Sequence, residues 1–294
     1  MTDFLQILLN GVSLGSIYAI VALGFVLIYK ATDVFNFAQG ELMMIGAYIC
    51  YTLIIHLKLG YAISLFLTLC FCFVFGIIIE VLILRPLLGK PVFSVIMVTV
   101  GLAVILQGSV SLIWGDDVNN FPPLFADRTL HFIGISLKPT DIWIFAATVL
   151  LVIGFFLFFR KSKVGLAMRG TANNQDIALL MGINVKRIFS LSWAIAASIA
   201  GIAGICYANV LFLAPDMSHI GLKAFPAAIL GGLDSIPGAI AGGILIGICE
   251  TMAGGYLDQI VGGGIKEISS FIVLIAILMV RPYGLFGKAI ITRV

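Results

Sequence analysis

Long apolar runs, separated by short polar breaks, extend along most of the chain. A helix needs about 20 mostly apolar residues to cross the hydrocarbon core of a bilayer, and several runs reach that length. We expect spans over residues 7–29, 37–56, 61–84, 92–114, 141–159 and 188–213, a span or half-span over 221–233, and later spans ending near 256 and 280. Uninterrupted apolar runs do not fit the alternating pattern of a membrane β-barrel. The pattern therefore predicts an all-α polytopic membrane protein of about eight transmembrane helices, forming a single domain over residues 1–294.

Composition agrees with this class. Hydrophobic residues make up 61% of the chain and charged residues 11%, which is too little charge to cover a soluble domain of this length. The net charge of +3 gives no nucleic-acid signal, so no nucleic-acid partner is expected. The five cysteines lie inside apolar runs without metal-ligand spacing; we interpret them as reduced packing residues and expect no metal site. The first apolar run has neither a basic leader nor a cleavage site, so we interpret it as a span.

The longest basic interruption covers residues 160–187. It carries several cations and a single acid, namely Arg160, Lys161, Lys163, Arg169, Lys186, Arg187 and Asp176. Cationic loops between spans are retained on the cytoplasmic side. The pattern predicts a short helix from Ala172 to Met181, because polar residues open it and apolar residues follow one side. Gly182 suits its left-handed end. Such a helix either binds a soluble partner or lies on lipid headgroups.

Alternation of spans from this cytoplasmic connector orients the rest of the chain. Most of the 17 basic residues then lie inside, among them Lys30, Arg85, Lys90, Arg281, Lys288 and Arg293. The remaining ones lie outside, namely Lys58, Arg128, Lys138, Lys223 and Lys266. This arrangement places the N-terminus and the polar loop 115–140 outside and the C-terminus inside. It holds only if residues 221–233 count as a crossing.

Glycine and proline interrupt the apolar stretch 221–243. Pro226 and Pro237 cannot donate backbone hydrogen bonds, so we expect no continuous helix there. Interrupted helices at membrane depth survive only inside protein or beside a water-lined cavity, and they point to a translocation path. The alternative is a tight turn at the membrane surface, which residues 233–237 resemble.

Two helices carry stripes of small or polar residues. Between 92 and 114, small or polar residues recur every four positions, at Thr99, Ala103, Gln107 and Ser111, so they share one face that packs on protein or borders water. In the span 188–213, small residues recur at heptad spacing, which predicts close contact with a neighbouring helix. These helix-packing residues are Ala194, Ala197, Gly201, Gly204 and Ala208, together with Ser190 at the start of the seam.

Three carboxylates fall inside predicted spans, where an unpaired charge costs roughly 2.5–3.5 kcal/mol. Glu41 opens its span and is either a helix-start anchor near the cytoplasmic face or part of a gate. Glu80 lies close to Arg85, so we expect it to snorkel toward the surface in a structural role. Glu250 lies well inside its span and either bonds across helices or borders the path. Otherwise the spans carry no strongly charged cluster, which suits a route for apolar solutes.

Motifs for phosphate-binding loops, zinc proteases and nucleophile elbows are absent from the sequence. We therefore expect no enzyme activity and no cofactor in this chain. If the protein transports actively, another chain must supply the ATP chemistry.

Three ordered segments resemble a known family. They are GSIYAIVALG at 15–24 with NFAQGE at 36–41, ALLMGINV at 178–185, and GLKAFPAAILGG at 221–232 with SIPG at 235–238. They are similar to the LivH-type permease subunits of bacterial branched-chain amino acid ABC importers, and the likeness covers nearly the whole chain. One departure is Gln39, where many relatives carry histidine.

The resemblance implies an inner-membrane subunit whose connector helix docks on an ATPase. The implied coupling residues are Ala172, Asn173, Asp176, Ala178, Leu180, Met181 and Gly182. Implied partners are a second, LivM-like permease, two ATPases that bind ATP and Mg²⁺, a periplasmic amino-acid-binding protein and membrane lipids. Candidate residues for the path or its gate are Asn36, Gln39, Glu41, Thr99, Gln107, Phe225, Pro226 and Glu250. Alternatives are a urea or short-amide importer of the same family, and a stand-alone secondary transporter or channel.

Overall fold

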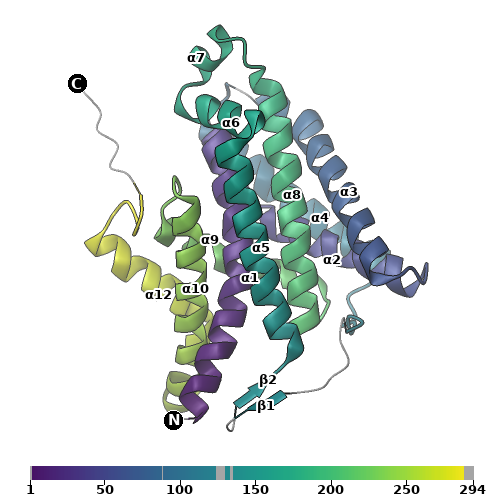
Figure 1. The fold of residues 1–294 in the computed structure, drawn as a ribbon, viewed down its shortest axis with the longest axis vertical. Coiled ribbons are helices and arrows are strands. Elements are labelled where there is room, and N and C mark those ends of the chain that lie inside the picture. Colours follow the sequence, from purple (N-terminus) through teal and green to yellow (C-terminus); the bar gives the residue numbers. More distant parts are fainter. Residues whose placement is uncertain (1, 88, 124–129, 133–134, 288–294) are drawn as a thin grey trace.

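A bundle of long apolar helices forms the protein (Figure 1), and the computed structural model describes residues 2–87, 89–123, 130–132 and 135–287. Among these residues, six helices are long and apolar enough to cross a membrane. They are α1 (Thr2–Thr32), α3 (Tyr61–Ile79) with the helical turns that continue it to Leu87, α4 (Val92–Trp114), α5 (Pro139–Lys161), α8 (Val185–Val210), and α10 (Ile236–Met252) with the helical turns that continue it to Val261. Shorter apolar helices are α2 (Gln39–Ile55), α9 (His219–Gly231) and α12 (Ile265–Val280). The predicted all-α polytopic membrane protein is confirmed, whereas the number of about eight spans stays a prediction.

The two ends of the bundle differ. The helices α6 (Lys163–Asn173) and α7 (Gln175–Leu180) project beyond one end, called here the connector end (Figure 1). The start of α1 and the antiparallel strands β1 (Leu130–Phe132) and β2 (Ile135–Leu137) lie at the opposite end, called here the hairpin end (Figure 1). The side-chain amide of Gln6 holds β2 on α1, because it exchanges two hydrogen bonds with the backbone of Ser136, at 3.1 and 2.9 Å. Arg128, Lys288 and Arg293 lie outside the described residues.

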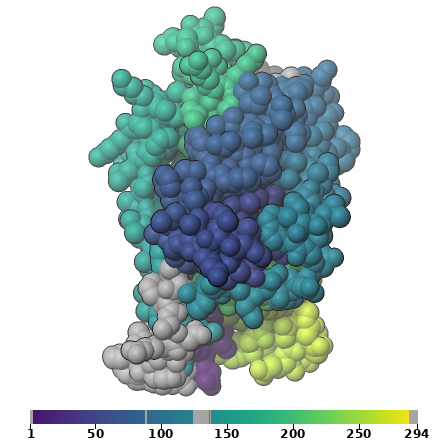
Figure 2. All heavy atoms as spheres, turned by 90° about the vertical axis from the view of Figure 1, so that its right-hand side faces the viewer, coloured from purple at the N-terminus to yellow at the C-terminus, as the bar shows by residue number. Residues whose placement is uncertain are grey.

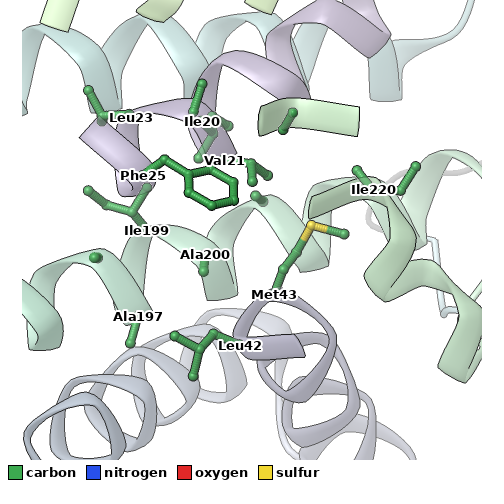
Figure 3. Packing of buried hydrophobic residues seen from close by; sticks show 14 of the residues in the cluster. Ile20, Val21, Leu23, Phe25, Leu42, Met43, Ala197, Ile199, Ala200 and Ile220 are labelled. Carbon is green, nitrogen blue, oxygen red and sulfur yellow. The ribbon is translucent and has the colours of Figure 1, made fainter. Parts of the chain in front are cut away.

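Helices α1 and α8 form the centre of the bundle. Most of each spanning window is buried, whereas α3, α4 and α5 leave most of theirs exposed toward the surrounding lipid. Figure 2 shows α3 and α4 covering one side of the molecule, with the earlier part of the chain visible only between and below them. Side chains from α1, α2, α8 and α9 meet in one apolar cluster around Phe25 and Met43 (Figure 3). The outer helices thus enclose a core built mainly on α1 and α8.

Glycines let these helices approach closely. A methyl group at Gly204 of α8 would overlap the carbonyl oxygen of Met43 in α2, and one at Gly46 of α2 would overlap the backbone of Gly201. In the same way Gly247 of α10 lies against the backbone of Gly15 in α1. Ala194, Ala197 and Ala208 are also buried on α8. Close approach of this kind stabilises helix association in lipid through dispersion contacts, because the hydrophobic effect adds little there.

The chain uses one arrangement twice, in opposite directions. A long central helix (α1, then α8) is followed by a short helix that begins inside the bundle (α2, then α9). A third helix follows (α3, then α10), and each of these ends in a π-helical turn, at Glu80–Leu84 and Ala253–Leu257. Helix α1 runs from the hairpin end to the connector end, and α8 runs back. Inverted repeats with short helices at their interface are typical of membrane transport proteins.

The predicted break at Pro226 is wrong, because α9 continues through this residue. A proline inside a helix lacks the amide donor and crowds the carbonyl four residues earlier, here that of Leu222, yet α9 continues past Pro226. The chain turns instead at Gly232, whose φ of 99° favours glycine. Ser235 then caps α10 by accepting from the amide of Gly238 at 3.1 Å, and Pro237 lies in the first turn, where proline is tolerated. The tight turn considered for residues 233–237 is therefore confirmed.

Replacement of Gly204 by valine should destabilise the protein by about 1–3 kcal/mol, since the new side chain would force α2 away from α8. Gly108 on α4 provides the matched control, because no atom of the described part of the chain lies within 4 Å of a Cβ placed there. Thermal melting of both variants in detergent checks the prediction. Equal melting temperatures for Gly204→Val and Gly108→Val would contradict the close contact.

Candidate functional site

The short helix α2 begins inside the bundle and not at its surface. The amide of Gln39 donates to the carbonyl of Ala196 in the middle of α8, at 3.3 Å, and lies against Gly24 of α1. Helix α1 continues for about two turns beyond Gly24, so the start of α2 lies roughly 12 Å below the connector end. Glu41 therefore lies in the first turn of a helix that begins inside the bundle, and its expected place near the cytoplasmic face stays a prediction.

Polar side chains hold the chain in this inward loop. Asn36 is fully buried and accepts a hydrogen bond from the amide of Ala38 at 3.1 Å. Its own amide donates to Gln39 Oε1 at 3.2 Å. On α4, the hydroxyl of Thr99 accepts from the amide of Phe37 at 3.4 Å. These bonds replace the water that a surface loop would bind, which explains how non-helical backbone persists at this depth.

The starts of α2 and α9 meet in the interior, at a place called here the junction. The backbone of Gly40 lies against the backbone of Gly221 and against the carbonyl of Ser218, so a side chain at either glycine would overlap the other helix. From the junction, α2 runs to the hairpin end and α9 to the connector end. The start of a helix carries partial positive charge, and Glu41 supplies a carboxylate in the first turn of α2. One of its oxygens, Oε2, is buried without a hydrogen-bond partner among the described residues.

A cleft opens on the hairpin-end side of the junction. It has a volume of about 560 Å³, and Gln107 and Ser111 of the α4 stripe line it. Opposite them lie Pro215 and Asp216, which lead into Ser218 and the start of α9. The α4 stripe therefore divides into two parts: Gln107 and Ser111 border the cleft, whereas Thr99 packs on the loop before α2.

An aromatic cluster closes the connector-end side of the junction. The ring of Phe225 on α9 lies 5.8 Å from Phe25 of α1, 5.2 Å from Phe35 and 5.5 Å from Phe37, and Phe35 stacks on Tyr29. Sequence reasoning identified only Phe225. The available signal in the sequence was the pair of aromatic residues, Phe35 and Phe37, on both sides of the path candidate Asn36. The cleft, the junction and the aromatic cluster thus follow one another along the bundle, with the aromatic side closed.

Two of the candidate path residues, Pro226 and Glu250, lie outside the cleft and the aromatic cluster. Pro226 is buried on α9, one position after Phe225. Glu250 of α10 accepts from the hydroxyl of Tyr18 at 2.6 Å and from Lys223 Nζ at 3.1 Å. Lys223 also pairs with Glu267 at 2.5 Å. These bonds tie α9 to α1, α10 and α12 on the side of α9 away from the aromatic cluster.

This charge cluster corrects two expectations. Lys223 was expected to lie outside the membrane but lies within α9, with its side chain 15% exposed beside a carboxylate that is only 2% exposed. The expectation that the spans carry no strongly charged cluster is also wrong. Tyr18 and Glu250 stand 232 positions apart in the chain, and sequence patterns give no information on which distant groups meet.

Glu80 lies in a second buried cluster, at the connector end. Both of its oxygens bind Arg85, and Glu80 Oε2 also accepts from the hydroxyl of Ser190 on α8, at 2.6 Å. The carboxylate is 2% exposed, so the expectation that it snorkels to the surface is wrong. Arg85 folds back to Glu80, and the pair ties the end of α3 to α8.

The connector forms two helices where a single one was predicted. Asn174 separates them, because its side chain accepts from the amide of Ile177 at 2.9 Å and so starts α7 anew. Ala172 and Asn173 therefore end α6, and Asp176 lies in the first turn of α7. Gly182 has a φ of 81°, as its predicted left-handed position requires.

Helix α7 has one buried and one exposed side. Ala178 packs on Ala31 at the end of α1 and on Val185 and Phe189 at the start of α8. The exposed apolar residues are Ile177 (57%), Leu179 (56%), Leu180 (86%) and Met181 (78%). Beside α7 lies a cavity of about 160 Å³, bordered by Gln175 and by Asp33 of the loop that leads to α2. Burial raises the pKa of the Asp33 carboxyl, and the nearby charge of Asp234 raises it further.

Comparison with known proteins identifies the family. The model of the family described as branched-chain amino acid transport system / permease component matches residues 7–280. The chain belongs to this family. It is 34% identical over 307 residues to the high-affinity branched-chain amino acid transport system permease protein LivH of Escherichia coli K12, covering 99% of this chain and 98% of that one.

Other relatives are similar over comparable lengths. The permease protein BraD of Pseudomonas aeruginosa is 32% identical over 317 residues, covering 99% of this chain and 98% of that protein. A probable LivH of Methanocaldococcus jannaschii is 33% identical over 294 residues, covering 96% and 92%. No solved structure matches the chain. The family and the apolar helices together show a multi-pass membrane protein that is a component of a transport system.

If Lys223 is replaced by methionine, Glu250 loses its cation and stays buried, which should cost about 3–5 kcal/mol of stability. The double variant Lys223→Met/Glu250→Met should recover most of this loss. The matched control is Glu267→Gln, which removes the 64% exposed partner and should change stability by about 1 kcal/mol or less. Unfolding in mixed micelles measures all three. A double variant no more stable than the single one would argue against the pair.

Proposed function

We propose that this chain is the transmembrane permease subunit of an ABC importer that carries branched-chain or other hydrophobic amino acids inward. The names of its relatives support the substrate class, and separate ATPase subunits would hydrolyse ATP. The observation that carries the proposal is α7, a helix held firmly on α1 and α8 that presents unpartnered apolar side chains beyond the bundle. Those side chains fit a groove on a soluble partner, and in this proposal the partner is an ATPase.

The path runs along the cleft, the junction and the aromatic cluster. An amino acid delivered by a binding protein enters the cleft at the hairpin end, between Gln107 and Asp216. The closed aromatic cluster then marks the state in which the path is shut toward the connector end. Because its rings offer apolar and polarisable surface without a fixed charge, it suits an aliphatic side chain. The cleft is open along one side, so a second, LivM-like permease would supply the facing wall.

Coupling follows from the helices that α7 contacts. Ala178 lies on α1 and α8, and the same two helices hold Gln39 at the start of α2 through Gly24 and Ala196. A push on α7 would therefore reach the junction through two continuous helices. ATP-driven closure of the ATPases would tilt α1 and α8, separate α2 from α9 and open the aromatic cluster. This is alternating access in which the junction itself opens and closes.

The proposal fixes the sides of the membrane. The connector end, with α6, α7 and their cations, faces the cytoplasm of the bacterial inner membrane. The hairpin end faces outward and receives the periplasmic binding protein. Since the soluble receptor selects the solute, a urea or short-amide importer of the same architecture is the nearest alternative. A stand-alone transporter would leave the exposed apolar side of α7 without a role, and solute flux by this chain alone in liposomes would support it.

Replacement of both Leu180 and Met181 by aspartate should abolish co-purification of the ATPase subunits and reduce amino acid uptake to background, because charged side chains cannot enter an apolar groove. The variant should still insert and melt normally, since both residues are exposed. Leu166→Asp on α6 is the matched control, because Leu166 is similarly exposed (63%) but lies outside α7. Full ATPase recovery with Leu180→Asp/Met181→Asp would refute α7 as the docking helix.

A further inference from the structure

A groove on the outer surface of the bundle lies between α3 and α5, with α8 as its floor. Its volume is about 370 Å³, and its lining consists almost entirely of carbon. The apolar residues that line it include Leu65 and Leu69 of α3, Ala147 and Leu151 of α5, and Ile202 and Ile205 of α8. Both walls belong to helices that leave most of their surface exposed, so the groove faces lipid and not the path.

The groove changes from polar to apolar along the membrane normal. Its polar lining groups are Tyr61 at the start of α3, Thr140 at the start of α5 and Asn209 at the end of α8, all at the hairpin end. Leu69 and Leu151 lie two to three turns deeper. At a rise of about 1.5 Å per residue, the groove extends roughly 12–16 Å from its polar end. That length is about half the hydrocarbon thickness of roughly 30 Å, which is the share of one leaflet.

The polar end offers hydrogen-bonding groups to a ligand. Asn209 donates to the hydroxyl of Tyr61 at 3.1 Å and to the carbonyl of Ile205 at 2.8 Å. Its side-chain oxygen Oδ1 is buried and has no hydrogen-bond partner among the described residues. The Tyr61 hydroxyl accepts from Asn209, so its own hydrogen remains to be donated. An unpaired acceptor next to lipid is unfavourable, and a donor on the ligand would satisfy it.

We propose that the groove binds one acyl chain of a phospholipid from the leaflet at the hairpin end. The acyl chain lies on Ile202 and Ile205, and the glycerol and headgroup region lies at Tyr61 and Asn209. Because Asn209 Oδ1 needs a donor, headgroups with N–H or O–H groups, such as ethanolamine or glycerol, bind better than choline. The bound chain fills the space between α3 and α5 and joins α5, which leads into the connector, to the rest of the bundle.

Other occupants fit the groove less well. A transmembrane helix of a partner would continue across the whole membrane, whereas the groove ends near its middle. A free amino acid needs partners for its ammonium and carboxylate groups, and among the described residues no charged side chain lines the groove. A phospholipid fits both features of the groove: its polar head matches the polar end, and its acyl chain matches the length of one leaflet.

Photolabelling of the unmodified protein tests the proposal without any variant. The protein is reconstituted with a trace of phosphatidylethanolamine that carries a photoreactive acyl chain, irradiated and digested, and the labelled peptides are mapped. Labels should concentrate in residues 140–151 and 202–209, and unlabelled phosphatidylethanolamine should compete better than phosphatidylcholine. Labels spread evenly over the exposed faces of α3, α4 and α5 would overturn the proposal, because that pattern describes unspecific lipid contact.

A pair of neighbouring variants on α5 provides a second measurement. Ala147→Phe places a ring in the groove, whereas Ala146→Phe places the same ring next to it, outside the lining. Native mass spectrometry should find one retained phospholipid on the unmodified protein and on Ala146→Phe, and none on Ala147→Phe. Retention by an Ala147→Phe protein that melts like Ala146→Phe would overturn the assignment of the site. The Asn209→Leu variant should still retain one phospholipid but should no longer prefer phosphatidylethanolamine over phosphatidylcholine.

Discussion

The need to pair backbone hydrogen-bonding groups in lipid determines how this protein is built. Two helices, α2 and α9, begin inside the bundle, where the first amides of a helix have no water to bind. The structure covers both starts by bringing them together at Gly40 and Gly221 and enclosing them between α1 and α8. This solution requires backbone-to-backbone approach at several places. For that reason glycines occupy the contacts of α8 with α2 and of α1 with α10.

The same constraint provides the means of transport that we propose. A place where the starts of two helices meet is closed by few contacts, so a modest movement of the enclosing helices can open it. Here the enclosing helices are also the ones that α7 contacts at the connector end. The buried ion pairs fix the other side of each repeat, since Glu80 ties α3 to α8 and Glu250 ties α10 to α1 and α9. Movement is therefore concentrated at the junction, between the cleft and the aromatic cluster.

The sequence predicts the fold class, most helix positions and the place of the connector, because apolar run length, cationic loops and caps act locally. It does not predict that Asn174 divides the connector into two helices. Gly182 and the turn before Pro237 follow from the same local rules. Local rules do not predict how deep in the bundle a residue lies or which distant residues it contacts. The pattern of residues 36–41 indicates a helix start but not that Gln39 reaches Ala196 in the bundle interior. In the same way, nothing near Lys223 in the sequence shows that Glu250 and Tyr18 surround it. The rule that proline breaks helices, applied alone, predicted a break at Pro226, but α9 continues through this residue.

A reversible cross-link across the aromatic cluster tests the central claim that this closed region blocks the path. Phe37 and Phe225, whose ring centres lie 5.5 Å apart, are replaced by cysteines and joined by a short reducible reagent. Phe71 and Phe75 on exposed α3, whose ring centres are also 5.5 Å apart, are treated identically as the control. Uptake by vesicles containing the complete importer should fall to background in the first variant, return on reduction, and stay unchanged in the control. Full uptake by a completely cross-linked Phe37→Cys/Phe225→Cys protein would contradict the account.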